Sequence, residues 1–259
     1  GSLINKIKLP KNRKHKIPVI CIGNIIAGGS GKTPITIALA KMFKKQRKNV
    51  HIIHKEFNTS INSNCTKVNI KDSALRVGDE PLMSARVAST WVCKKRQFGI
   101  NKAINDGADV ILLDDGLQDD TVHKDFSIMV INEKQGFGNR HLIPAGPLRE
   151  NIKAGLEKTD CIFFYGTKKS LQSLLPSCNK KVILVKLRPN NKNLQILAKK
   201  QFIAFAGIAH PENFYDLLRK SKINIIRRIS YPDHYKYKKK DLDKIMNISK
   251  NINSSVITT

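Results

Sequence analysis

Long apolar runs and paired cysteines are both missing from this sequence of 259 residues. No stretch of about 18 apolar residues occurs, so the sequence predicts no membrane-spanning helix. The five cysteines are odd in number and form no CxxC pair. We therefore expect reduced thiols in a cytoplasmic setting rather than a disulfide framework or a zinc site.

Acidic residues are scarce, above all at the start of the chain. None precedes Glu56, against thirteen lysines and arginines, and the formal net charge of the chain is +27. Two explanations stay open: a lysine- and asparagine-rich composition spread over a solvated surface, or attraction to an anionic partner. The six basic residues from Lys6 to Lys16 would each contribute about 1 kcal/mol near an anionic membrane leaflet. Nucleic-acid binding usually adds stacking aromatics; only Tyr231, Tyr235 and Tyr237 gather, so we expect no nucleic-acid partner.

Apolar runs alternate with helical patterns along the chain, and this alternation predicts parallel βαβ units in a doubly wound sheet. A helix is expected to begin near Asp79, with Asp79 as its N-cap and Pro81 in its first turn. The Gly- and Pro-rich stretch 136–150 interrupts the alternation. We therefore expect an α/β protein with a P-loop NTPase-like nucleotide-binding domain over 1–134 and a second, smaller α/β domain over 135–259. The predicted strands are 17–24, 50–53, 109–116, 126–133, 161–166, 181–187, 202–208, 223–229 and 254–258.

The stretch "GNIIAGGSGKTP", residues 23–34, predicts a phosphate-binding loop although Ile26 stands where the usual pattern has its first glycine. A buried strand leads into a glycine-rich turn, and a helix follows at once with its partial positive end toward the phosphates. Lys32 would reach the β- and γ-phosphates, and the Thr33 hydroxyl would be a ligand of Mg²⁺. The predicted nucleotide-binding residues are Ala27, Gly28, Gly29, Ser30, Gly31, Lys32, Thr33 and Pro34.

A phosphate-binding loop needs carboxylates on its magnesium side. Asp114 and Asp115 directly follow four apolar residues of a predicted buried strand and are expected to supply them. A kinase also needs a base near the acceptor hydroxyl, and Asp79 and His234 are candidates. From the residues alone, Asp79 is as well explained as a helix cap and His234 as a structural histidine, and hydrolysis and phosphoryl transfer both stay open.

Five motifs together resemble one family, the tetraacyldisaccharide 4′-kinases. They occur in the family's order from about Ile17 to Thr259: "GNIIAGGSGKTP", "VGDEP", "DDGLQ", "GFGNRHLIPAGPLRE" with "AFAGIAHPENF", and "YPDHY". The family shares the missing early glycine. The resemblance implies a kinase that uses ATP and Mg²⁺ to phosphorylate the 4′-hydroxyl of tetraacyldisaccharide 1-phosphate, giving lipid IVA in lipid A biosynthesis. It also implies that nucleotide and lipid meet between a larger and a smaller domain.

The resemblance assigns roles to individual residues. It implies that Lys32 and Thr33 hold the phosphates and the metal, with Asp114 and Asp115 on the magnesium side. Asp79 would be the base that takes the 4′-hydroxyl proton. His234 would pair with Asp79 and tune it. Substrate contacts are expected from Gln118, Asn139 and Arg149.

The sequence departs from the family at several places. The basic lead "LINKIKLPKNRKHK" replaces an apolar N-terminal helix, so we expect a peripheral protein at the cytoplasmic face of the bacterial inner membrane. "HKEFNTS", residues 54–60, replaces a Ser-Arg-Gly-Tyr-like motif, and Asp119 replaces a usual histidine. Two alternatives to the kinase stay open: a P-loop ATPase or polyanion-binding module, and a family member without turnover. The sequence predicts no protein partner.

Overall fold

The computed structural model describes residues 15–56, 61, 63–187, 194, 197, 199–208, 210–233 and 235–259. The chain divides into two compact units, Gly1–Lys186 and Leu187–Thr259. Among the described residues, no helix is both long and apolar enough to cross a membrane.

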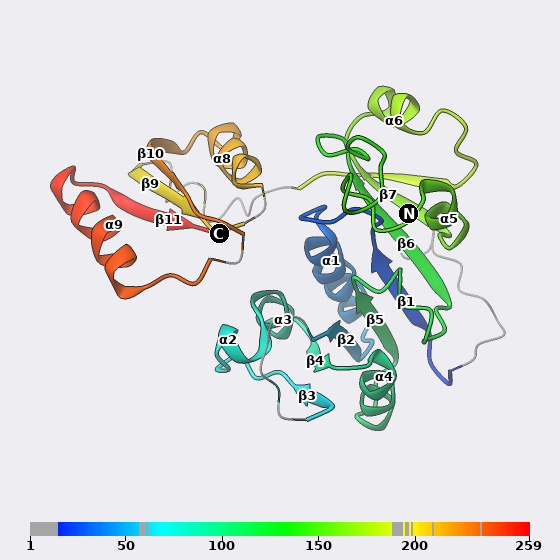
Figure 1. The fold of residues 1–259 in the computed structure, drawn as a ribbon. Coiled ribbons are helices and arrows are strands. Elements are labelled where there is room, and N and C mark those ends of the chain that lie inside the picture. The colour runs from blue at the N-terminus through cyan, green and yellow to red at the C-terminus, as the bar shows by residue number, and fades with distance from the viewer. Residues whose placement is uncertain are drawn as a thin grey trace. The chain divides into compact units, whose positions relative to one another are not determined.

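The first unit is built on an eight-stranded sheet (Figure 1) in the order β3-β4-β2-β5-β1-β6-β7-β8. Every neighbouring pair is parallel except β3 and β4. β1 is buried along its whole length, because its alternate side chains enter the cores on the two faces of the sheet. The strands are β1 (Val19–Gly23), β2 (Val50–Lys55), β3 (Cys65–Lys67), β4 (Ser89–Cys93), β5 (Val110–Asp114), β6 (Phe126–Asn132), β7 (Cys161–Tyr165) and β8 (Lys181–Val185).

Helices pack on both faces of this sheet. α1 (Lys32–Lys45) contributes Ile35, Leu39 and Phe43 to the core on one face. α4 (Arg96–Asn105), α5 (Ile152–Glu157) and α6 (Lys168–Leu174) contribute to the core on the other. α2 (Ala74–Val77) and α3 (Asp79–Ala85) form a smaller cluster beside β4. The doubly wound α/β sheet expected from the sequence is thereby confirmed.

The boundary between the units lies further along the chain than the expected division between residues 134 and 135. β7 and β8 extend the large sheet beyond β6, so the first unit reaches Lys186. The Gly- and Pro-rich stretch 136–150 is not a junction between the units. It returns to the start of the phosphate-binding loop, where Leu148 forms an antiparallel bridge with Ile26.

The second unit is a smaller α/β layer. Its three parallel strands have the order β10-β9-β11, and separate apolar clusters form around Tyr215 of α8 and Ile245 of α9. The elements are β9 (Gln201–Ala206), α8 (Pro211–Lys220), β10 (Asn224–Ser230), α9 (Lys239–Asn251) and β11 (Ser255–Thr258).

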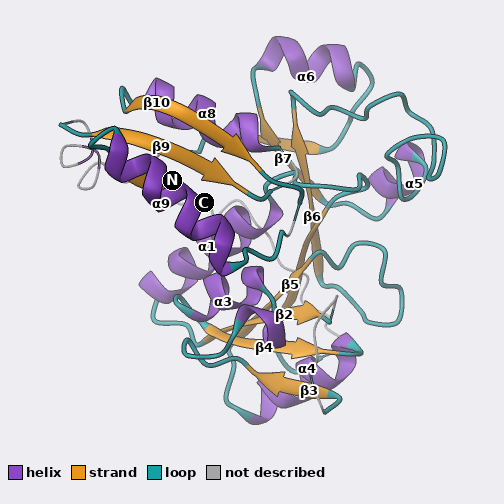
Figure 2. Ribbon diagram, turned by 60° about the vertical axis from the view of Figure 1, so that its left-hand side comes forward, coloured by secondary structure: helices purple, strands orange, loops and turns teal. Residues whose placement is uncertain are grey.

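Several local features differ from the sequence expectation. β4 and α4 were not predicted, because the short run 89–93 and the polar stretch 96–105 carry weak periodicity. β3 lies in a stretch where no strand was predicted, and it pairs with β4 (Figure 2). Cys65 and Cys93 on these two strands form a disulfide, whereas reduced thiols were expected. Asp79 is the first residue of α3 rather than its N-cap, which is Gly78, while Pro81 lies in the first turn as expected.

The close approach of α5 to the phosphate-binding loop gives a test of packing. A Cβ on Gly155 would lie 2.4 Å from Cγ2 of Ile25. Gly155→Ala is therefore expected to lower the free energy of unfolding by about 1–3 kcal/mol, because overpacking outweighs the helix preference of alanine. Lys153→Ala, on an exposed position of the same helix, should change it by less than about 0.5 kcal/mol. Equal stability of the two variants in urea unfolding would contradict this packing.

Candidate active site

The phosphate-binding loop joins β1 to α1 by a backbone path that needs glycine. Gly28 and Gly31 have φ angles of 102° and 88°, values that residues with a side chain rarely adopt. A Cβ on Gly31 would also lie 2.8 Å from Cε2 of Tyr165, at the end of β7. α1 then begins at Lys32, so its first N–H groups face the turn as an anion site requires.

The missing early glycine has a structural explanation. Ile26, which is 3% exposed, forms its bridge with Leu148 instead of turning. On either side, the N–H of Ala27 donates to the carbonyl of Pro147 at 2.8 Å, and the N–H of Arg149 donates to that of Ile25 at 2.8 Å. Residues 25–27, which lead into the glycine turn, are therefore extended and paired with residues 147–149. This conformation does not require a positive φ. The N–H of Ala27 is used in this pairing rather than presented to a phosphate.

Asp114, at the end of β5, holds the first turn of α1 in place through hydrogen bonds. Its carboxylate accepts hydrogen bonds from Oγ1 of Thr33 at 2.9 Å and from Oγ1 of Thr36 at 3.1 Å. Burial raises the pKa of Asp114 to about 6. The predicted pair of Thr33 and Asp114 is therefore brought together, with a hydroxyl and a carboxylate at one edge of the sheet.

Asp115 lies next to the cations of the site. Nζ of Lys32 is 3.6 Å from Oδ1 of Asp115, and Nη1 of Arg149 donates to Oδ2 at 2.8 Å. Burial opposes ionisation, but the positive charges of Lys32 and Arg149 hold the pKa of Asp115 below its usual value. Asp115 has a φ of 54°, a sparsely populated conformation that marks many functional turns.

Arg96, which the sequence did not single out, holds the turn that follows β5. The guanidinium group is 3% exposed and donates to Asp119 at 2.9 Å. It also donates to the carbonyls of Asp114 at 3.1 Å and Asp115 at 2.6 Å. Asp119 is therefore the anionic partner of a buried arginine.

Around the loop and the turn after β5, five buried polar atoms make no hydrogen bond within the described part of the chain. They are Nδ2 of Asn24, Oγ of Ser30, Nε of Arg96, Oδ1 of Asp115 and Oε1 of Gln135. Buried polar groups are almost always satisfied, so such atoms indicate a bound group. Two donors beside a glycine turn suit phosphate oxygens, and carboxylate and hydroxyl oxygens are ligands that Mg²⁺ prefers. The residues present therefore fit a nucleotide with Mg²⁺.

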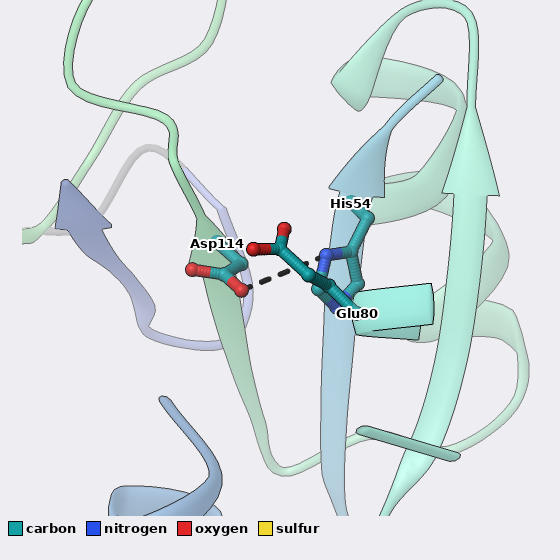
Figure 3. A group of neighbouring side chains, drawn as sticks. All are labelled: His54, Glu80 and Asp114. Atoms are coloured by element: carbon teal, nitrogen blue, oxygen red, sulfur yellow. Dashed lines mark ion pairs between the residues drawn. The ribbon is translucent and has the colours of Figure 1, made fainter. Parts of the chain in front are cut away.

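A further cluster lies beside Asp114 (Figure 3), and the sequence analysis missed it. Nδ1 of His54, at the end of β2, is 3.6 Å from Oδ2 of Asp114, and Glu80 of α3 lies next to both. Burial lowers the pKa of His54 to about 4. Removal from water, followed by the negative charge of Asp114, raises the pKa of Glu80. Only the tertiary structure reveals this cluster, because its members are far apart in the sequence.

The other predicted residues have varied surroundings. Asp79 is exposed at the start of α3, directly before Glu80. Gln118 donates to the carbonyl of Asn24 and to Glu150, each at 2.7 Å. Asn139 braces its own loop by donating to the carbonyl of Ala145 at 2.9 Å. His234 lies outside the described residues.

The contacts of Arg96 give one testable consequence. Arg96→Lys keeps the charge but cannot reach three acceptors at once, since lysine lacks the planar fork of arginine. We expect it to lower the free energy of unfolding by about 1–3 kcal/mol and to weaken ATP binding, because the turn carrying Asp115 loosens. Lys95→Ala, at the exposed neighbouring position, is the control. An unchanged urea midpoint for Arg96→Lys would overturn this role.

The pKa of Asp114 predicts a pH dependence of stability without nucleotide or metal. The pKa rises from 3.8 to about 6 on folding, so the folded state holds a proton that the unfolded state releases. This contribution to stability is lost as the pH rises through the folded pKa, by about 1 kcal/mol between about pH 5 and about pH 7.5. Asp114→Asn should remove that part of the dependence in urea unfolding with EDTA. Parallel pH profiles for the two proteins would contradict it.

Comparisons with known proteins agree with this geometry. The family model of the tetraacyldisaccharide-1-P 4′-kinase, LpxK, matches residues 3–259. The tetraacyldisaccharide 4′-kinase of Rickettsia typhi is 39% identical over 93% of this chain and 74% of its own length. That of Gluconobacter oxydans is 33% identical over 94% of this chain and 74% of its own length.

A solved structure has the same fold. LpxK from Aquifex aeolicus, in complex with ATP, superposes with a TM-score of 0.71 at 26% identity, covering 96% of this chain and 79% of that one. Three findings point to the same family. They are the match of the family model over nearly the whole chain, the curated relatives, and the phosphate-binding loop with its offset glycine. The chain therefore belongs to the tetraacyldisaccharide 4′-kinase family.

Proposed function

We propose that this protein transfers the γ-phosphate of ATP, with Mg²⁺, to the 4′-hydroxyl of tetraacyldisaccharide 1-phosphate and so produces lipid IVA. The observation that carries the proposal is the pairing of Thr33 with Asp114 at the mouth of a phosphate-binding loop that has the family's offset glycine. The name of the relatives and the ATP complex of the Aquifex aeolicus protein support the choice of donor and acceptor.

The chain's own residues would act mainly by positioning and by balancing charge, as phosphoryl transfer requires. Lys32 is held beside Asp115 at 3.6 Å and near Asn24 at 3.2 Å, which orients its ammonium group for the β- and γ-phosphates. Ser30 and the first N–H groups of α1 would bind phosphate oxygens. Thr33, Asp114 and Asp115 would hold Mg²⁺, which when bound neutralises charge on those oxygens.

The acceptor side of the proposal depends on Asp79 and His234. Asp79 would accept the proton of the 4′-hydroxyl, and His234 would hold and tune its carboxylate. Two observations support this role. Asp79 is exposed at the start of α3, and the residue that follows it, Glu80, lies beside Asp114. Gln118, Asn139 and Arg149 are proposed to contact the substrate, with Gln118 and Asn139 also ordering the loops around it.

The proposed place of action is the cytoplasmic face of the bacterial inner membrane, where the protein would bind as a peripheral enzyme. The net charge of +27 supports this proposal, because both substrates are anionic and the glycolipid lies in a membrane whose headgroups attract basic segments.

The test is transfer of label from γ-labelled ATP to tetraacyldisaccharide 1-phosphate in detergent micelles. Lys32→Ala should lower kcat/KM at least as far as His234→Ala, because base catalysis adds only about 10²–10⁴-fold. Asp79→Asn should remove nearly all transfer while ATP still binds. Lys41→Ala, at an exposed position of α1, should remain active.

Each contrary outcome identifies an alternative. Label released as inorganic phosphate without labelled lipid would indicate an ATPase. ATP binding with neither product would indicate a family member without turnover. Salt-dependent binding of oligonucleotides, together with no lipid product, would favour the polyanion-binding module.

A further inference from the structure

His54, Glu80 and Asp114 converge from three elements. Ile53 of β2 is in register with Leu113 of β5, so the next residues, His54 and Asp114, lie side by side where these parallel strands end. Glu80 reaches the same place from the first turn of α3. In Figure 3 the imidazole and the two carboxylates point toward one another, and their nearest ligand atoms all lie within 4.8 Å.

The hydrogen bonding of His54 leaves one ring nitrogen for a ligand. Nε2 lies 3.0 Å from Oγ of Ser84, which is completely buried. Nδ1 lies 3.6 Å from Oδ2 of Asp114, too far for a hydrogen bond. Either Nε2 or Oγ of Ser84 can donate in this hydrogen bond. In the tautomer with the proton on Nε2, that N–H donates to Ser84 and Nδ1 presents its lone pair to the carboxylates. A histidine held by a hydrogen bond from its other nitrogen is the usual arrangement around metals.

The charges of the cluster also favour a cation. His54 and Asp114 are 4% and 2% exposed, and Glu80 stands at the exposed position of the cluster. Two carboxylates therefore face one imidazole. Lys32 contributes a positive charge nearby, but its ammonium group lies beside Asn24 and Asp115.

The geometry points to a divalent metal site formed by Nδ1 of His54 and the carboxylates of Glu80 and Asp114, selective for first-row transition-metal ions such as Mn²⁺ or Co²⁺ over Mg²⁺. Two ligands of one such ion stand up to roughly 4.2 Å apart, so a small rotation of the exposed Glu80 closes the site. An imidazole nitrogen is a ligand of first-row transition-metal ions, with affinity rising from Mn²⁺ to Co²⁺, whereas Mg²⁺ takes oxygen ligands. This inference does not depend on the identity of the phosphate acceptor.

The site shares a ligand with the phosphate-binding loop. The carboxylate of Asp114 that faces His54 also accepts a hydrogen bond from Thr33. Occupancy of the site would therefore be coupled to the nucleotide's magnesium through the shared carboxylate of Asp114.

The test uses the full chain, treated with EDTA and free of nucleotide. Co²⁺ is titrated and followed by its visible absorption, and Mn²⁺ and Mg²⁺ are titrated by calorimetry. We expect one Co²⁺ or Mn²⁺ bound at least about tenfold more tightly than Mg²⁺. His54→Ser should weaken Co²⁺ and Mn²⁺ binding by about 10–100-fold or more, with Mg²⁺ affinity nearly unchanged.

Two further variants keep the test decisive if His54→Ser does not fold. Glu80→Gln removes an exposed carboxylate ligand and should weaken Co²⁺ binding. Ser84→Ala should weaken it by about tenfold, because Nε2 loses the partner that orients the ring. His123→Asn, an exposed histidine outside the cluster, should bind Co²⁺ as the wild type does.

The proposal is overturned by any of three results: tighter binding of Mg²⁺ than of Mn²⁺, wild-type Co²⁺ affinity in the folded His54→Ser or Glu80→Gln protein, or loss of Co²⁺ binding in His123→Asn. Because no nucleotide or lipid is present, such a failure leaves the proposed kinase activity untouched. Conversely, a protein without lipid transfer could still bind Co²⁺ at His54.

Discussion

Thr33 and Thr36 both donate hydrogen bonds to the buried carboxylate of Asp114, and the candidate site depends on this contact. It holds the first turn of α1 against the end of β5 and so sets where Lys32 and the loop's N–H groups lie. Burial of that carboxylate raises its pKa, because the charged form is harder to solvate there. Oδ2 of Asp114, which accepts from Thr33, also lies 3.6 Å from Nδ1 of His54. The phosphate-binding loop and the cluster around His54 therefore share this carboxylate.

The second constraint on the loop comes from a segment more than a hundred residues away. The strand-like pairing of Ile26 with Leu148, and the hydrogen bonds on either side of it, hold the lead-in extended. In the common form of the motif a glycine sets the path of the chain into the loop. Here the backbone pairing sets that path. The same segment carries Arg149 and Glu150 to Asp115 and Gln118, which links the phosphate side of the site to the turn after β5.

Two buried side chains order the groups around Asp114 and Asp115. Asp119 pairs with the buried Arg96, whose other hydrogen bonds hold the backbone of Asp114 and Asp115. His54 is hydrogen-bonded to Ser84 and adds a nitrogen to a group of oxygens. Both side chains have hydrogen-bond partners, because an unpaired buried polar group would cost stability.

The sequence by itself determined the elements nearest to the chemistry. The apolar run of β1, the glycine turn with Lys32 and Thr33, and Asp114 after β5 were all predictable, since a strand, its loop and the next helix are encoded by consecutive residues. Only the tertiary structure decided which distant groups join them. The order of strands places His54 beside Asp114, and the packing of α4 places Arg96 at the turn after β5. Residues 144–150 return to pair with the start of the phosphate-binding loop, where the common motif has a glycine. Side chains from separate elements converge through sheet order and packing, which local periodicity does not encode.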